Sequence, residues 1–228
     1  MKKNSAILML VMLLSAAILM AQDDAFSAYQ KNPTEETFAA AQAELGAQLN
    51  EDEANAQARI MLGWLYIMET DRQLAWFEEH SDELQPGQRF GWANLLLGMG
   101  RYDEAIAQYE KLNEASPKWS CPWRHRGEAL YSSGHFAKAE EALAMAIETR
   151  VEHYDAYVWM AKAQHAQGKD KDALATLETG FTYLGKDIED PAEELDDAEV
   201  KELYATLLEA NGRTDEAQKV RAHIKSND

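Results

Sequence analysis

The sequence has little cysteine, proline or glycine. The single cysteine, Cys121, excludes an intramolecular disulfide and any zinc site built on several cysteines. Twelve glycines and five prolines among 228 residues favour helices over a sheet joined by many turns. Basic residues are also scarce, with 22 Lys and Arg against 40 Asp and Glu, for a net charge of -18. A surface this acidic repels phosphate backbones and argues against a nucleic-acid partner, although acidity also simply keeps a protein soluble.

Motifs of catalysis are missing as well. The sequence contains no glycine-rich phosphate loop, no His-Glu-x-x-His helix and no nucleophile elbow. Cys121 and His125 are the one candidate pair for a chemical site, because residues four apart share a helix face. With His165 one repeat further on, they suggest a reactive thiol or part of a metal site, whereas an inert, packed cysteine is the simpler interpretation. We therefore predict no catalytic residue, no metal ligand and no cofactor.

The N-terminus has the order of a secretory signal peptide. Lys2 and Lys3 precede an uncharged stretch over 4–22 that Asp23 closes, and Ala21 is the expected last residue of a signal at 1–21. An uncleaved membrane anchor is the alternative, since 19 uncharged residues nearly span a bilayer. In both cases we expect the folded part outside the cytoplasm, periplasmic or secreted, and the short dilysine start favours a bacterial cell envelope. Without the two lysines, 20 basic and 40 acidic residues give a net charge of -20.

The strongest signal in the sequence is a repeat of 34 residues. Ala93, Gly127 and Ala161 occupy equivalent small-residue positions. A glycine follows each of them seven residues on, and an alanine five residues later: Gly100, Gly134 and Gly168, then Ala105, Ala139 and Ala173. Apolar residues at helical spacing flank each glycine, so every copy predicts two helices. The small residues fit where those two helices cross closely. A fixed period of this length predicts a stack of helical pairs.

This pattern resembles the tetratricopeptide repeat, which favours aromatic, small and proline residues at fixed sites of a 34-residue unit. The matching residues are Trp123 and Tyr157 at site 4, Trp92 and Met160 at site 7, the three alanines at site 20, Tyr109 at site 24, Ala146 at site 27 and Pro117 at site 32. Three copies follow in register, at 86–119, 120–153 and 154–187. The resemblance implies an all-α, right-handed superhelical solenoid.

The resemblance extends outward less regularly. We expect an N-terminal helical cap or degenerate repeat at 24–55, a shortened repeat at 56–85 with Gly63 at the small-residue position, and a C-terminal capping repeat at 198–228. An acidic insertion separates the last two copies at 188–197. From 187 to 199 there are eight acidic residues and no basic one, which indicates a solvated loop or a contact for a divalent cation or basic partner.

The resemblance also implies where a partner binds. In this family the first helix of each pair lines a concave groove, and sites 5, 9 and 12 usually meet the ligand. The candidate partner-binding residues are Trp64, Phe90, Asn94, Arg124, Glu128, Tyr131, Val158, Lys162 and His165, with Ile60 and Ile67 beside Trp64. Apolar anchors with a few charges are typical of peptide-binding surfaces. Phe90 stands where the family's clamp for a peptide C-terminus requires lysine. Alternatively, some of these apolar residues pack against the N-terminal helices or a second copy of the chain.

Together these patterns predict an exported, non-catalytic scaffold that binds a protein or peptide in its groove. A membrane tether is expected only if the N-terminal segment stays uncleaved, and homo-oligomers through an uncapped end are a further option. Two other classes are left open. One is a periplasmic small-molecule receptor with a pocket enclosed by the helical array, and the other is an enzyme that uses Cys121.

Overall fold

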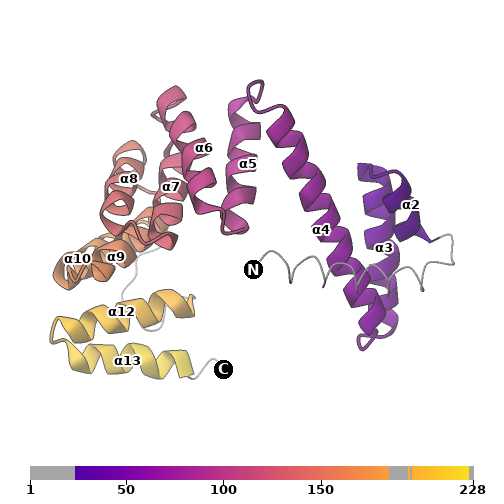
Figure 1. Cartoon of the computed structure of the whole chain (residues 1–228). Coiled ribbons are helices and arrows are strands. Elements are labelled where there is room, and N and C mark those ends of the chain that lie inside the picture. Colours follow the sequence, from indigo (N-terminus) through magenta and orange to yellow (C-terminus); the bar gives the residue numbers. More distant parts are fainter. Residues whose placement is uncertain (1–23, 185–194, 196, 226–228) are drawn as a thin grey trace, which may run out of the picture. The chain divides into compact units, whose positions relative to one another are not determined.

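The computed structural model describes residues 24–184, 195 and 197–225 (Figure 1). The chain forms two compact units, one ending at His80 and one beginning at Ser81, and each is described by itself. Within the described ranges the secondary structure is helical, without strands. None of the helices in this part of the chain is long and apolar enough to cross a membrane. The predicted signal or anchor at 1–21, and the predicted insertion apart from Leu195 and Asp197, lie outside the described residues.

Unit 1 consists of α2 (Ala25–Lys31), α3 (Glu35–Glu51) and α4 (Ala56–Glu79). Each helix begins at a polar side chain that accepts a backbone N–H of the first turn: Asp24, Thr34 and Asn55. Helix α3 packs against both α2 and α4. The buried core between them is formed by Phe26, Tyr29, Ala41, Leu45, Ala58 and Leu65. The caps and this small core account for the three helices.

The expected shortened repeat at 56–85 is corrected by the structure. One continuous helix of 24 residues, α4, occupies the place of a helix pair. Gly63 is exposed, and a Cβ added to it would meet nothing within 4 Å, so it does not mark a close helix crossing. The physical reason lies at Thr70, where the other copies carry their helix-ending glycine. A β-branched residue does not adopt the left-handed turn that ends those helices, so α4 continues.

Unit 2 is a stack of four helical hairpins (Figure 1). They are α5 (Pro86–Gly98) with α6 (Tyr102–Ala115), α7 (Ser120–Ser132) with α8 (Phe136–Thr149), α9 (Tyr154–Ala166) with α10 (Asp170–Phe181), and α12 (Ala198–Ala210) with α13 (Thr214–Lys225). The first three hairpins begin 34 residues apart, and the fourth begins 44 residues after the third. The predicted all-α solenoid is confirmed.

Glycine ends the first helix of every hairpin in unit 2. Gly100, Gly134, Gly168 and Gly212 have φ angles of 72°, 82°, 73° and 78°. In the second hairpin the Gly134 N–H donates to the Tyr131 carbonyl at 2.9 Å and the His135 N–H to the Leu130 carbonyl at 2.8 Å. This pattern satisfies the last carbonyls of the helix and turns the chain into α8. The predicted helix ends at the first three glycines are confirmed.

The small-residue positions are also where predicted. Ala93 and Ala161 are fully buried. A Cβ added to Gly127 would lie 2.4 Å from Leu143 Cγ, closer than real Cβ contacts come. Helices α7 and α8 therefore cross at a distance that only glycine permits at this point.

Neighbouring hairpins pack mainly through the second helix of one against the first helix of the next, with α6 on α7, α8 on α9 and α10 on α12. The first helices also contact one another, α7 with α5 and α9, and α9 with α12, whereas the second helices α6, α8 and α10 meet one another marginally or not at all. The first helices therefore form one continuous side of unit 2, which we call the inner face (the surface of α5, α7, α9 and α12). The second helices form the opposite, outer face.

Candidate functional site

Arg124 lies at the centre of the inner face and joins two neighbours on α7. One helical turn separates Arg124 from Glu128, so the guanidinium reaches the carboxylate, with Nη1 2.6 Å from Oε2. Arg124 Nη2 lies 2.5 Å from His125 Nε2. Because a guanidinium only donates, His125 accepts through Nε2 and directs Nδ1 to Glu128 Oε2, 3.4 Å away. The three side chains form one polar cluster on a single helix face.

The charge of Glu128 is held in place by its surroundings. Burial by itself raises the pKa of Glu128. The contact with His125 and the charges of Arg124 and Lys162 outweigh burial and bring the pKa below its ordinary value. Glu128 is therefore an ionised, half-buried carboxylate at neutral pH, compensated from two helices.

An aromatic wall adjoins this cluster. The Phe90 ring of α5 meets the rings of Trp119 and His125 at centroid distances of 4.9 and 5.3 Å. Tyr109 of α6 stacks on His125 at 5.9 Å, and its hydroxyl donates to Asn94 Oδ1 at 2.6 Å. Burial raises the pKa of Tyr109, so the hydroxyl keeps the proton that it donates. Asn94 is consequently positioned by the second helix of its own hairpin.

Lys162 extends the site toward the C-terminal hairpin. Its ammonium lies 4.4 Å from the ring centroid of Trp159, a cation–π contact, and 2.5 Å from Glu199 Oε1 of α12. Trp159 in turn meets Tyr131 of α7 edge-on at 5.5 Å. The inner face thus carries one connected set of rings and charges over all four hairpins. We call it the inner-face network: Phe90, Asn94, Tyr109, Arg124, His125, Glu128, Tyr131, Trp159, Lys162 and Glu199.

Six of the nine predicted partner-binding residues belong to this network: Phe90, Asn94, Arg124, Glu128, Tyr131 and Lys162. His165 lies at the end of α9 and pairs with Asp170 at 2.5 Å instead. The prediction that Val158 lines an open groove is wrong, because only 7% of the residue is exposed. Val158 packs in the core that α9 and α10 share with the last hairpin. Trp64 belongs to unit 1 and packs against the core of that unit.

Several members of the network are not predicted by the sequence. The sequence pairs His125 only with Cys121, whereas its ring faces Arg124 and Glu128. Cys121 is half-buried. Over the described residues, no group of three or more His, Cys, Asp and Glu side chains could hold a metal ion. The helical register of Trp159 was a usable signal, since it turns the ring away from the partner helix of the pair. Glu199 carried no comparable signal because an insertion precedes it.

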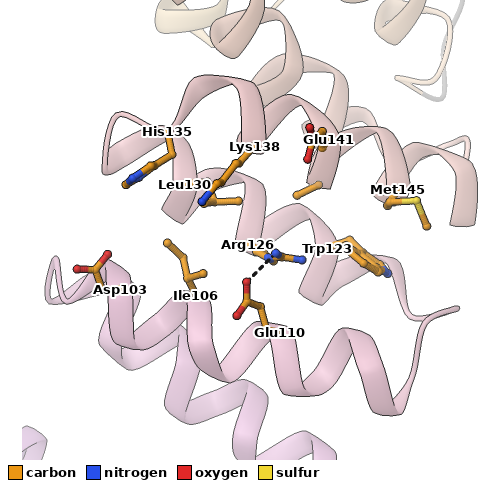
Figure 2. Close-up of a pocket in the computed structure, with 11 residues that line it drawn as sticks. Asp103, Ile106, Glu110, Trp123, Arg126, Leu130, His135, Lys138, Glu141 and Met145 are labelled. Atoms are coloured by element: carbon orange, nitrogen blue, oxygen red, sulfur yellow. Dashed lines mark hydrogen bonds and ion pairs between the residues drawn. The ribbon is translucent and has the colours of Figure 1, made fainter.

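A groove of about 460 Å³ lies on the outer face between α6 and α8, with residues of α7 between them. Figure 2 shows the side chains that line it. Ile106, Leu130 and Trp123 provide apolar surface, and Arg126 crosses it to Glu110 at 2.7 Å. The groove has apolar and charged walls together. Sequence analysis did not anticipate it.

The comparisons with known proteins agree with the repeat geometry. Two family models, both described as tetratricopeptide repeat, match residues 93–118 and 125–179. The chain contains tetratricopeptide repeats. The two matches begin at the small-residue position of α5 and at His125 of α7, so most of the network lies in matched tetratricopeptide repeats.

Solved tetratricopeptide repeat structures share the fold. A tetratricopeptide repeat protein from Parabacteroides merdae is 14% identical, with a TM-score of 0.57 over 88% of this chain and 76% of that one. MamA from Desulfovibrio magneticus is 13% identical, with a TM-score of 0.59 over 77% and 94%. YrrB, described as a TPR protein with an unusual peptide-binding site, is 18% identical, with a TM-score of 0.55 over 70% and 76%. No curated protein matches the sequence.

We expect His153, at the start of α9, to make the stability of unit 2 depend on pH. Burial lowers the pKa of His153, and the charges of Arg124 and Arg150 lower it further. The folded protein therefore binds this proton less readily than the unfolded chain, whose histidine pKa is about 6.5. Stability is complete above about pH 6.5 and falls as the pH drops toward the lowered folded pKa. We expect His153→Gln to reduce the loss of melting temperature between pH 7.5 and 5.0.

The matched control for this prediction is His135→Gln, since His135 is exposed. It should leave the pH dependence of the melting temperature as in the wild type. Equal pH profiles for His153→Gln and the wild type would contradict the assignment.

Proposed function

We propose that this protein is an exported scaffold that binds a protein or peptide partner on the inner face of unit 2. The observation that carries the proposal is the inner-face network, in which Phe90, Tyr131 and Trp159 adjoin the charges of Arg124 and Lys162. Aromatic side chains and arginine dominate the binding energy of peptide and protein interfaces. The peptide-binding site named for YrrB, a structure with the same fold, lends support.

The finer parts of the proposal rest on the sequence. Lys2, Lys3 and the uncharged stretch behind them support export into a bacterial envelope. Mass spectrometry of the protein from an envelope fraction tests this part, because a cleaved chain would begin after residue 21. We assign the protein no catalytic step, because partner binding alone accounts for the network. Retention of any detected activity by Cys121→Ala would dismiss an enzyme that uses this thiol.

The binding role is tested in two steps. A photo-crosslinking amino acid in place of Tyr131 captures the partner in cells, and mass spectrometry identifies it. The affinity of the purified pair is then measured for the double variant Arg124→Glu and Lys162→Glu. Reversing two charges at the centre of the face should weaken an acidic or C-terminal peptide partner at least about tenfold.

The matched control reverses two exposed lysines on outer helices, Lys111→Glu and Lys171→Glu, which changes the net charge equally. Circular dichroism melts first establish that both double variants fold. Unchanged affinity in the inner-face variant, or an equal loss in the outer-face variant, would remove the proposal.

A small-molecule receptor is a second candidate, supported by the outer groove. Its volume of about 460 Å³ lies in the range of ligand sites. Leu130 is buried on its apolar wall, while Glu110 and Arg126 add polar groups that could orient a ligand. Native mass spectrometry of the purified protein tests for a ligand that copurifies.

A further inference from the structure

The two ion pairs of the inner-face network are built differently. Glu128 is half-buried and faces Arg124, His125 and Lys162, so it is compensated several times over. Glu199 meets Lys162 at 2.5 Å, yet 76% of its side chain is exposed, whereas only 13% of the Lys162 side chain is exposed. The cation of this pair is fixed and sheltered, and the anion lies at the surface.

Glu199 does not provide the cap of its helix. It belongs to the first turn of α12, which the Asp197 side chain caps by accepting the N–H groups of Glu199 and Val200 at 2.8 and 3.1 Å. Lys162 keeps its place without Glu199, since the cation–π contact with Trp159 lies on its own helix. The Glu199 side chain can therefore leave while both helices stay formed.

We propose that Lys162 and Trp159 form an anchor for an acidic side chain of the partner, and that Glu199 occupies this anchor in the unbound protein. The inference rests on the proposed function of the inner face and names the partner group that binds there. This group is the side-chain carboxylate of an internal Asp or Glu with an apolar residue beside it. Glu199 itself presents a side-chain carboxylate from a continuing chain, and Trp159 offers apolar surface next to the ammonium.

Replacing the Glu199 carboxylate by the partner's carboxylate at Lys162 changes the free energy little. An exposed ion pair changes an equilibrium constant by at most about five-fold, so Glu199 reduces partner affinity by no more than that. The net charge of -18 disfavours a strongly acidic partner. The anchor therefore selects a single carboxylate in an otherwise neutral segment.

The test uses three short peptides and nuclear magnetic resonance, which detects weak binding. The probe is acetyl-Gly-Leu-Glu-Leu-Gly-amide. Its counterpart has glutamine in the centre, and the third peptide is that counterpart with a free C-terminus. Each is titrated into the full chain, and the Trp159 indole and inner-face amide signals are followed. The variants are Glu199→Gln, Lys162→Gln and, as matched control, Glu202→Gln, which removes another exposed carboxylate of α12.

We expect Glu199→Gln to bind the glutamate peptide up to about five-fold more tightly than the wild type. Glu202→Gln should match the wild type, and Lys162→Gln should lose the preference for glutamate over glutamine. Equal affinities of Glu199→Gln and Glu202→Gln would overturn the inference, as would a glutamate preference that survives Lys162→Gln. Binding of only the free C-terminus would overturn it in favour of a terminal carboxylate. If both blocked peptides perturb the inner face equally, the inference fails and the proposed function stands. If no peptide perturbs it in any variant, both fail.

Discussion

Replacing Gly127 by valine is expected to destabilise unit 2 by about 3 kcal/mol, because overpacking a tight helix crossing costs about this much. Even a single Cβ at this position would lie 2.4 Å from Leu143 Cγ and 2.7 Å from its Cδ2. Leu143 is fully buried in the core that α7 and α8 share. Urea unfolding followed by tryptophan fluorescence measures the loss.

Two further variants make this prediction specific. Gly91 lies inside α5, and a Cβ added there would meet nothing within 4 Å. Gly91→Ala should therefore stabilise the protein by about 0.5–1 kcal/mol through helix propensity. Leu143→Ala should recover part of the loss when combined with Gly127→Val, although it destabilises the protein alone. Additive losses in the double variant would show that the crossing is not the cause.

Glu69→Gln is expected to destabilise unit 1 by about 2 kcal/mol at pH 7, the magnitude of a buried hydrogen bond to a charged group. The Tyr29 hydroxyl donates to Glu69 Oε2 at 2.8 Å, and the Arg72 guanidinium contacts both carboxylate oxygens at 2.5 and 2.9 Å. The hydrogen bond from Arg72 is the main reason why the pKa of Glu69 falls to about 2. Tyr29 is a fully buried core residue, so loss of its acceptor affects the packing of α2.

The lowered pKa of Glu69 also predicts how the destabilisation by Glu69→Gln changes with pH. The Glu69 pKa is lower in the folded than in the unfolded protein, so its stabilising contribution is present above about pH 4.5 and is lost toward pH 2. The difference between Glu69→Gln and the wild type should therefore shrink as the pH falls over this range. Hydrogen exchange of the α2–α4 amides measures the stability of unit 1 directly. Asp71→Asn, an exposed carboxylate on the same helix, should have little effect. A constant difference down to pH 2 would contradict the assignment.

The sequence alone predicted those parts of the fold that follow local rules. Gly100, Gly134 and Gly168 end helices because they accept a positive φ angle, and that preference is visible in the residue itself. Gly127 marks a close crossing because the same position is small in every copy. The register of the first helices then placed Phe90, Arg124 and Lys162 on one face.

The parts that sequence reasoning missed depend on packing between segments. Val158 is covered because α12, which follows the insertion in the sequence, packs against α9. Glu199 reaches Lys162 from 37 residues away for the same reason. Helix α4 continues because Thr70 stands where the other copies have the glycine that ends the helix. Gly63 matches the small-residue position, but this match alone does not produce a helix pair. The outer groove arises from the gap between α6 and α8, which no single repeat contains.

The nearest-neighbour packing of the hairpins has a consequence for access to the inner face. A stack of hairpins that bury only their neighbours unfolds first at its ends, because a terminal hairpin loses one interface when it unfolds and an inner hairpin loses two. Helices α12 and α13 form such a terminal unit, and Glu199 travels with them. Fraying of the C-terminal hairpin therefore also uncovers Lys162, which adds a second route to the departure of the Glu199 side chain alone.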